Sequence, residues 1–151
     1  MLKKKGLYSM TLSIKDKVEL SHYRLEKAKK LLKDALNLFN SGSYESSVNR
    51  SYYAVLTASK SLLILRGIDP ETHEGVKTML SKEFIRTGIL PKETGETFRS
   101  IQARRIDSDY GDYIEIGIDE ASDSLKRAKE FIKKVEEVSN KMIEEIGKEK
   151  E

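Results

Sequence analysis

Apolar residues recur at three- and four-residue steps along most of this chain, which is the pattern of helices that bury one face. In the first stretch, Ser13 and Asp16 form a capping pair, and the apolar face continues to a turn at residues 40–42. In the second, Ser43 is placed to act as the N-cap, and Gly67 follows the last apolar residues. The pattern predicts two long helices in the first part of the chain.

Three further helical segments follow. Residues 69–72 begin a shorter helix that ends at residues 87–88, and Pro91 opens a fourth. Residues 111–117 then precede a long last helix that starts near Asp119. The sequence contains no strand-like alternation. We predict an all-α fold, a five-helix up-and-down bundle with three long and two shorter helices.

The length of 151 residues suits one domain. We expect a flexible N-terminal extension over residues 1–12, the bundle over residues 13–147 and a charged tail over residues 148–151. The absence of cysteine excludes disulfides, a thiolate nucleophile and thiolate metal sites. No apolar run is long enough to span a membrane, and the basic N-terminus lacks the apolar core of a signal peptide. These features favour a cytoplasmic protein without a membrane partner.

The formal net charge of +3 is too small to predict a nucleic-acid-binding protein by itself. The charge is unevenly distributed, because the first 60 residues hold 12 Lys and Arg against 5 Asp and Glu, whereas the remainder holds 16 against 20.

The stretch NRSYYA brings an amide, a guanidinium and a phenol together on one helix stripe, because Asn49 and Arg50 precede Tyr53 by four and three residues. Arginine beside tyrosine can hold a phosphate and stack a nucleobase. The alternative is that the tyrosines of this stretch fill the core and keep their hydroxyl groups at its edge.

A second basic feature is the pair Arg104 and Arg105, at the start of RRIDSDYGDY. Consecutive helical residues point about 100° apart, so one of the two can face solvent while the other faces the bundle. An arginine that faces inward must find an anion or a stacked partner.

Other chemistry is sparse in this sequence. The acids between residues 106 and 125 do not match a calcium-binding loop, and no metal or other cofactor is predicted. His73 lies ahead of the third helix, where a cap-region role is the default and proton transfer or phosphate binding the alternative. No Ser-His-Asp set, HExxH motif or glycine-rich phosphate loop occurs.

In order, NRSYYAVLTASKSLLILRGI, THEGV, FIRTGILP, RRIDSDYGDY and a last helix rich in alanine and lysine resemble the HEPN family. The likeness covers about residues 16–138 and is greatest to the small stand-alone archaeal and bacterial members. It implies a bundle that forms a homodimer. Many members are metal-independent ribonucleases that use an arginine followed, after four to six residues, by a histidine. Others are toxins paired with a minimal nucleotidyltransferase as antitoxin.

This chain departs from the ribonuclease motif, because Tyr110 stands where the late histidine is expected and no histidine follows His73. Tyrosine near its ordinary pKa is a poor base at neutral pH. The resemblance therefore implies a nucleotide- or partner-facing site. Its candidate residues are Asn49, Arg50, Tyr53, His73, Arg104, Arg105 and Tyr110.

Three functions remain open. The first is a nucleotide-binding and interaction module, dimeric and paired with a minimal nucleotidyltransferase, for which Tyr110 is a candidate modification site by family analogy. The second is a ribonuclease using Arg105 with His73 or Tyr110, guided to RNA by its basic first half. The third is a structural adaptor in which Arg50 and Arg105 pair with the bundle's own acids. The missing histidine favours the first.

Overall fold

The computed structural model describes residues 12–110 and 115–150. Within these ranges the chain forms α2 (Ile14–Asn40), α3 (Tyr44–Leu63), α4 (His73–Leu80), α5 (Lys92–Tyr110) and α6 (Ile118–Lys150). A 3-10 turn, η1 (Ile64–Arg66), extends α3, and a π-helical turn, η2 (Ser81–Ile85), extends α4. The described residues include five α-helices and no strand, so the predicted all-α class is confirmed.

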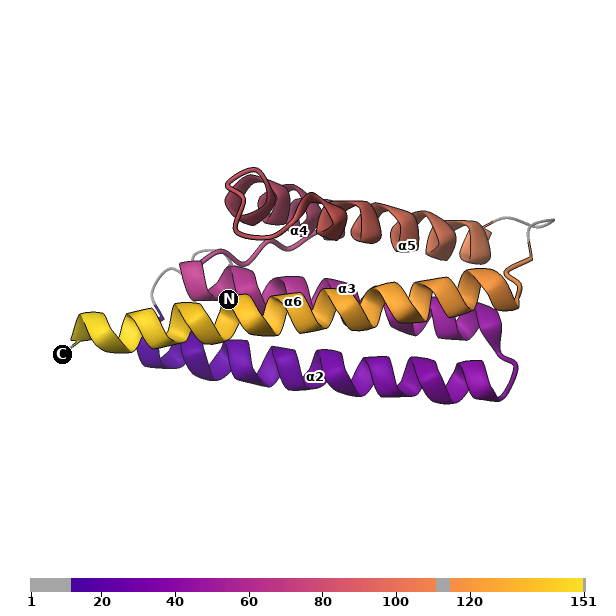
Figure 1. Ribbon diagram of the computed structural model, residues 1–151, viewed down its shortest axis with the longest axis horizontal. Coiled ribbons are helices and arrows are strands. Elements are labelled where there is room, and N and C mark those ends of the chain that lie inside the picture. Colours follow the sequence, from indigo (N-terminus) through magenta and orange to yellow (C-terminus); the bar gives the residue numbers. More distant parts are fainter. Residues whose placement is uncertain (1–11, 111–114, 151) are drawn as a thin grey trace.

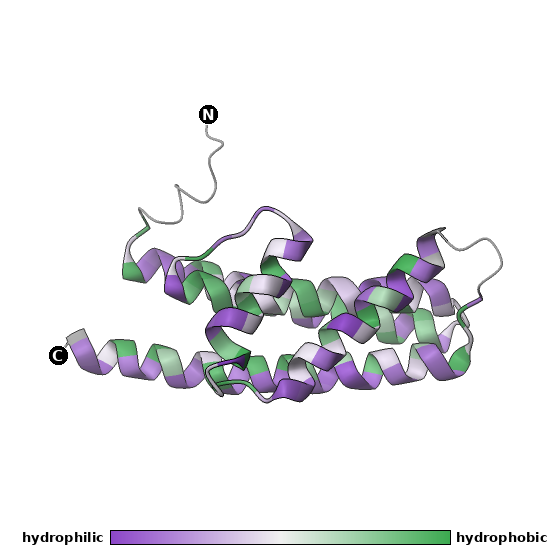
Figure 2. Ribbon diagram, turned by 90° about the horizontal axis from the view of Figure 1, so that it is seen from above, coloured by the Kyte–Doolittle hydropathy of each residue, from purple (hydrophilic) through white to green (hydrophobic). Residues whose placement is uncertain are grey.

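The three longest helices, α2, α3 and α6, lie side by side, and α4 and α5 lie on one side of them (Figure 1). Seen from above, α4 runs across the long helices and α5 lies obliquely over them (Figure 2). No helix in the described part of the chain is long and apolar enough to cross a membrane.

Local capping explains where several helices begin. Ser13 accepts a hydrogen bond from the Asp16 backbone N–H at 3.0 Å, as the capping pair predicts. Ser43 does occupy the N-cap of α3, but its side chain makes no capping hydrogen bond. Thr72 caps α4 by accepting from the Gly75 backbone N–H at 2.9 Å. This cap fixes His73 as the first residue of α4.

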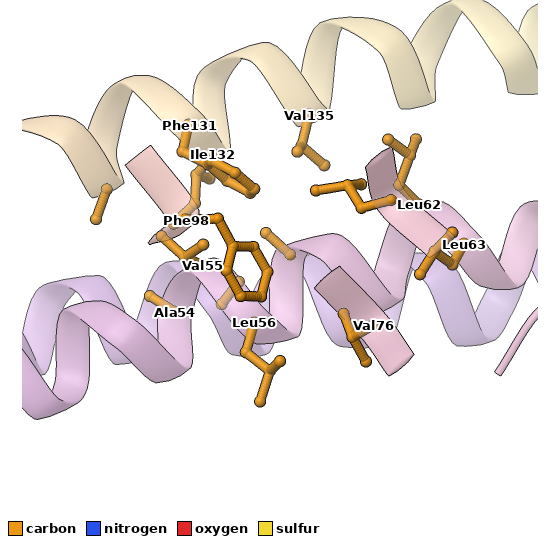
Figure 3. Close-up of a cluster of buried hydrophobic side chains, with 14 of the residues drawn as sticks. Ala54, Val55, Leu56, Leu62, Leu63, Val76, Phe98, Phe131, Ile132 and Val135 are labelled. Carbon is orange, nitrogen blue, oxygen red and sulfur yellow. The ribbon is translucent and has the colours of Figure 1, made fainter. Parts of the chain in front are cut away.

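The hydrophobic core draws residues from all five described helices and extends to the place where α5 packs onto α3 and α6. The Phe98 ring of α5 lies between these two helices, near Val55 and Ile132 (Figure 3). Its centroid is 6.2 Å from that of Tyr52 and 6.4 Å from that of Phe131, both in edge-on geometry. Such buried aromatic contacts add to the hydrophobic stabilisation of the fold.

The buried face of α5 continues from Phe98 through Ile101, which is fully buried, toward Arg105. Residues four and seven positions apart share one helix face, because an α-helix has about 3.6 residues per turn. Core packing of Phe98 and Ile101 therefore points Arg105, rather than Arg104, toward α3.

Candidate functional site

Arg105 stacks on a pair of tyrosines from α3. Its guanidinium carbon lies 5.3 Å from the ring centroid of Tyr52 and 5.6 Å from that of Tyr53. The two rings meet edge to face at 5.2 Å. Both distances to the guanidinium are within the range of a cation–π interaction, and only 19% of the Arg105 side chain is exposed. The cation is thus held close to the protein surface with one side against aromatic rings.

His73, from the start of α4, completes this cluster. Its Nδ1 lies 3.1 Å from the hydroxyl oxygen of the fully buried Tyr52, at hydrogen-bonding distance. Its ring centroid is also 5.7 Å from the centroids of both Tyr52 and Tyr53. Side chains from α3, α4 and α5 therefore meet at one place, which we call the Arg105 site: Tyr52, Tyr53, His73 and Arg105.

The electrostatics of the site favour a neutral histidine. Burial, together with the positive charges of Arg105 and Lys60, lowers the pKa of His73 below its ordinary value. Burial also raises the pKa of Tyr52, although a hydrogen bond with Gln102 and the charge of Arg105 oppose that rise. At neutral pH the site therefore holds one cation, Arg105, among uncharged rings.

Arg105 is only partly satisfied by the described residues around it. Its Nη2 donates to the Tyr53 hydroxyl at 3.4 Å, which is a long contact. Its Nε lies 3.0 Å from a carboxylate oxygen of Asp109, one turn further along α5. That contact is an ion pair without hydrogen-bond geometry, because the buried Nε makes no hydrogen bond within the described part of the chain. The guanidinium retains capacity to bind an anion.

A polar network holds α4 against α5 beside the site. Lys77 donates to the Gln102 side-chain oxygen at 3.0 Å and pairs with Glu74 at 3.2 Å. Because Glu74 and Lys77 lie one and four residues beyond His73, these contacts help to position the histidine relative to Arg105.

Arg104 points away from the site toward α6. It donates to the carboxylate of Asp123 at 2.8 Å, to the hydroxyl of Ser124 at 2.9 Å and to the backbone carbonyl of Glu120 at 3.3 Å. Partial burial alone would raise the pKa of Asp123, but its hydrogen bonds with Arg104 and Arg127 outweigh this and lower it. Arg104 thus holds α5 to α6.

Asn49 and Arg50 lie about one turn before Tyr53 on α3. They line a polar hollow of about 450 Å³ together with Leu38, Glu45, Ser46 and Asp109. Arg50 is exposed, and its Nη1 lies 3.5 Å from the Asn49 side-chain oxygen. Since Asp109 also pairs with Arg105, this hollow adjoins the Arg105 site.

Of the residues singled out from sequence, Tyr53, His73 and Arg105 meet, Asn49 and Arg50 line the adjoining hollow, and Arg104 lies elsewhere. The side chain of Tyr110 is outside the described residues. Sequence reasoning missed Tyr52 and Asp109 as site residues. Tyr52 carried a signal, since a tyrosine within an apolar helix stripe needs a polar partner for its hydroxyl group. Among the described residues, no group of three or more acids and histidines is placed to bind a metal ion.

Comparisons with known proteins agree with this architecture. The HEPN domain family matches residues 21–138. The chain is 30% identical over 131 residues to a UPF0332 protein of Thermotoga maritima, covering 87% of this chain and 96% of the relative. It is 38% identical over 110 residues to a Methanocaldococcus jannaschii protein named as a candidate toxin, covering 73% and 75% of the two chains.

The fold is also similar to a solved structure. The crystal structure of TT1696 from Thermus thermophilus superposes with a TM-score of 0.68, covering 78% of this chain and 97% of TT1696. The two share 22% sequence identity, so this likeness concerns the fold alone.

Proposed function

Because the chain belongs to the HEPN domain family, we propose that it is a nucleotide-binding and interaction module of a toxin–antitoxin type of system. The binding surface is the Arg105 site. The observation that carries the proposal is the convergence of Arg105, Tyr53 and His73 from three helices that are far apart in sequence. A stacked, incompletely hydrogen-bonded guanidinium suits a phosphate oxygen, and a half-buried tyrosine suits a neighbouring base.

The proposed assembly is a cytoplasmic homodimer that pairs with a minimal nucleotidyltransferase as antitoxin. Supporting this are the family membership and relatives from Methanocaldococcus jannaschii that are named as candidate toxins. Co-expression of the chain with such an enzyme, followed by measurement of the mass of the complex, tests the pairing. A single chain mass at working concentration and no co-purification would contradict it.

Binding at the Arg105 site is tested with a fluorescein-labelled single-stranded RNA of mixed sequence, measured by anisotropy at low and high salt. We expect binding that weakens with salt and is reduced at least about tenfold by Arg105→Ala, since one charge-assisted contact is worth on the order of a tenfold change. Arg99→Ala is the matched control, because Arg99 is an exposed arginine on the same helix. Equal losses in both variants would show that RNA does not use the Arg105 site.

A second function, metal-independent RNA cleavage, is favoured by the state of His73. A neutral imidazole beside a cation can accept the proton of a 2′-hydroxyl group while arginine holds the phosphate. The 2′-oxygen then bonds to phosphorus, and the bond from phosphorus to the 5′-oxygen breaks. That oxygen must receive a proton, which the imidazolium can return. Nε2 accepts this proton in the tautomer in which Nδ1–H donates to the Tyr52 hydroxyl oxygen, because Nε2 then carries no hydrogen.

Cleavage of the same RNA in the presence of a chelator distinguishes the two functions. Cleavage that disappears in both Arg105→Ala and His73→Ala would establish the ribonuclease. If the unmodified protein binds the RNA without cleaving it, the protein acts as a binding module and not as a ribonuclease. The remaining hypothesis, a structural adaptor, is consistent with the pairing of Arg105 and Asp109. Under this hypothesis the protein neither binds nor cleaves RNA.

A further inference from the structure

The carboxylate of Asp109 pairs with Arg105 at the edge of the polar hollow. It is 3.0 Å from Nε of Arg105, and it lines the polar hollow that Arg50 also lines. The Asp109 side chain is 32% exposed, whereas that of Arg105 is 19% exposed. A half-exposed carboxylate next to a more buried guanidinium occupies the position that an external anion would approach.

The contact between Asp109 and Arg105 provides charge neutralisation but a poor hydrogen bond. The Nε–H of Arg105 is buried and makes no hydrogen bond with any described residue, although the Asp109 oxygen is near it. A buried N–H group without a hydrogen bond carries a free-energy cost that a better-placed acceptor would remove. A phosphate has several acceptor oxygens in a fixed tetrahedral arrangement, and guanidinium groups bind it through two N–H groups at once.

We propose that Asp109 is the resident counter-ion of Arg105, and that the phosphate group of a nucleotide or RNA binds by taking its place. This rests on the proposed nucleotide-binding function of the Arg105 site. On displacement, the carboxylate remains in the adjoining hollow, where Arg50 is exposed and has no carboxylate partner among the described residues. Asp109 thus changes its partner from Arg105 to Arg50. Only a ligand that binds Arg105 more tightly than a single carboxylate does can displace it.

Asp109→Asn tests the exchange, because it keeps the shape of the side chain and removes its charge. With the labelled RNA at constant ionic strength, we expect binding to tighten by about two- to fivefold, the range that corresponds to loss of a partly exposed ion pair. Asp107→Asn is the matched control. It makes the same change in net charge on an exposed residue of the same helix, and we expect it to alter affinity much less.

A second comparison tests the part assigned to Arg50. Arg50→Gln is expected to weaken binding in the unmodified protein and to have no effect in the Asp109→Asn background, because no carboxylate then needs a new partner. Equal weakening in both backgrounds would mean that Arg50 contacts RNA itself and would overturn the exchange.

The outcomes separate this inference from the proposed function. If Arg105→Ala abolishes binding but Asp109→Asn leaves it unchanged or weaker, the site binds RNA and the exchange is wrong. If neither the unmodified protein nor Asp109→Asn binds RNA, both are wrong. The NMR signal of the Arg105 Nε–H group gives a second measurement. It should move on RNA addition in the direction of a stronger hydrogen bond, and an unchanged signal would contradict displacement of Asp109.

Discussion

The hydroxyl group of Tyr52 lies 3.1 Å from Nδ1 of His73, and this contact joins the hydrophobic core to the surface site. Tyr52 is fully buried and packs edge-on against Phe98, whereas His73 is only half-buried at the start of α4. The contact therefore orients the imidazole ring and satisfies the one polar atom of a core side chain. It also makes the stability of the fold depend on a residue of the candidate site.

Removal of the Tyr52 hydroxyl measures this dependence. We expect Tyr52→Phe to lower the free energy of unfolding by about 1–2 kcal/mol, because the hydroxyl group contacts both His73 and Gln102 and one hydrogen bond is worth about 1 kcal/mol net. Tyr53→Phe is the control, because among the described residues the Tyr53 hydroxyl receives only the long 3.4 Å contact from Arg105. Urea unfolding of both variants checks the difference. Equal and small losses would mean that the contact with His73 contributes little.

The lowered pKa of His73 predicts a pH dependence of stability. The folded protein binds this proton less readily than the unfolded chain, whose histidine titrates near the ordinary value of 6.5. The neutral imidazole therefore makes its full contribution to the free energy of unfolding above pH 6.5. This contribution is lost as the pH falls from there through the lower pKa of the folded state. His73→Gln should reduce this decline in urea unfolding measured from about pH 8 to about pH 5. If stability declined equally in His73→Gln, other titratable groups would be responsible for the decline.

The adjacent arginines Arg104 and Arg105 should affect different properties: removal of Arg104 should lower stability, and removal of Arg105 should weaken RNA binding. Arg104→Ala removes three hydrogen bonds to α6, and we expect a loss of about 1–2 kcal/mol in the free energy of unfolding. Arg127→Ala, which removes only an exposed pair with the same Asp123, should cost about 0.5 kcal/mol or less. At the same ionic strength, Arg104→Ala should leave the affinity for RNA within about twofold of that of the unmodified protein. A larger effect on RNA binding than that of Arg105→Ala would reverse the two assignments.

Two glycines allow a paired test of backbone strain. Gly42 has φ +83° with open space around it, so Gly42→Ala should cost about 1 kcal/mol through the left-handed conformation alone. Gly147 lies within α6 and also has open space, so Gly147→Ala should stabilise by up to about 0.8 kcal/mol. The thermal unfolding midpoint, Tm, should fall for Gly42→Ala and rise for Gly147→Ala. Shifts of the same sign would contradict the assigned role of φ at Gly42.

Much of the fold could be predicted because its signals are local. The Ser13 cap, the glycine-containing turn after α2 and the apolar face that includes Leu25 and Ala28 each depend on residues a few positions apart. Even so, α5 extends to Tyr110, about one turn beyond the last apolar residue of its pattern, Ile106. The crossing direction of α4 also had no local signal, because it depends on how α4 and η2 pack over the long helices.

The sequence by itself determined the five helices, the family resemblance and the residue types able to bind a phosphate, because periodicity, capping and motif order are properties of the chain. Tertiary structure decided which of these residues meet. Packing of Phe98 and Ile101 sets the rotation of α5, so Arg105 reaches Tyr53 across 52 positions of sequence while Arg104 pairs with α6. Contacts over such separations arise from the relative positions of whole helices, which no short stretch of sequence specifies.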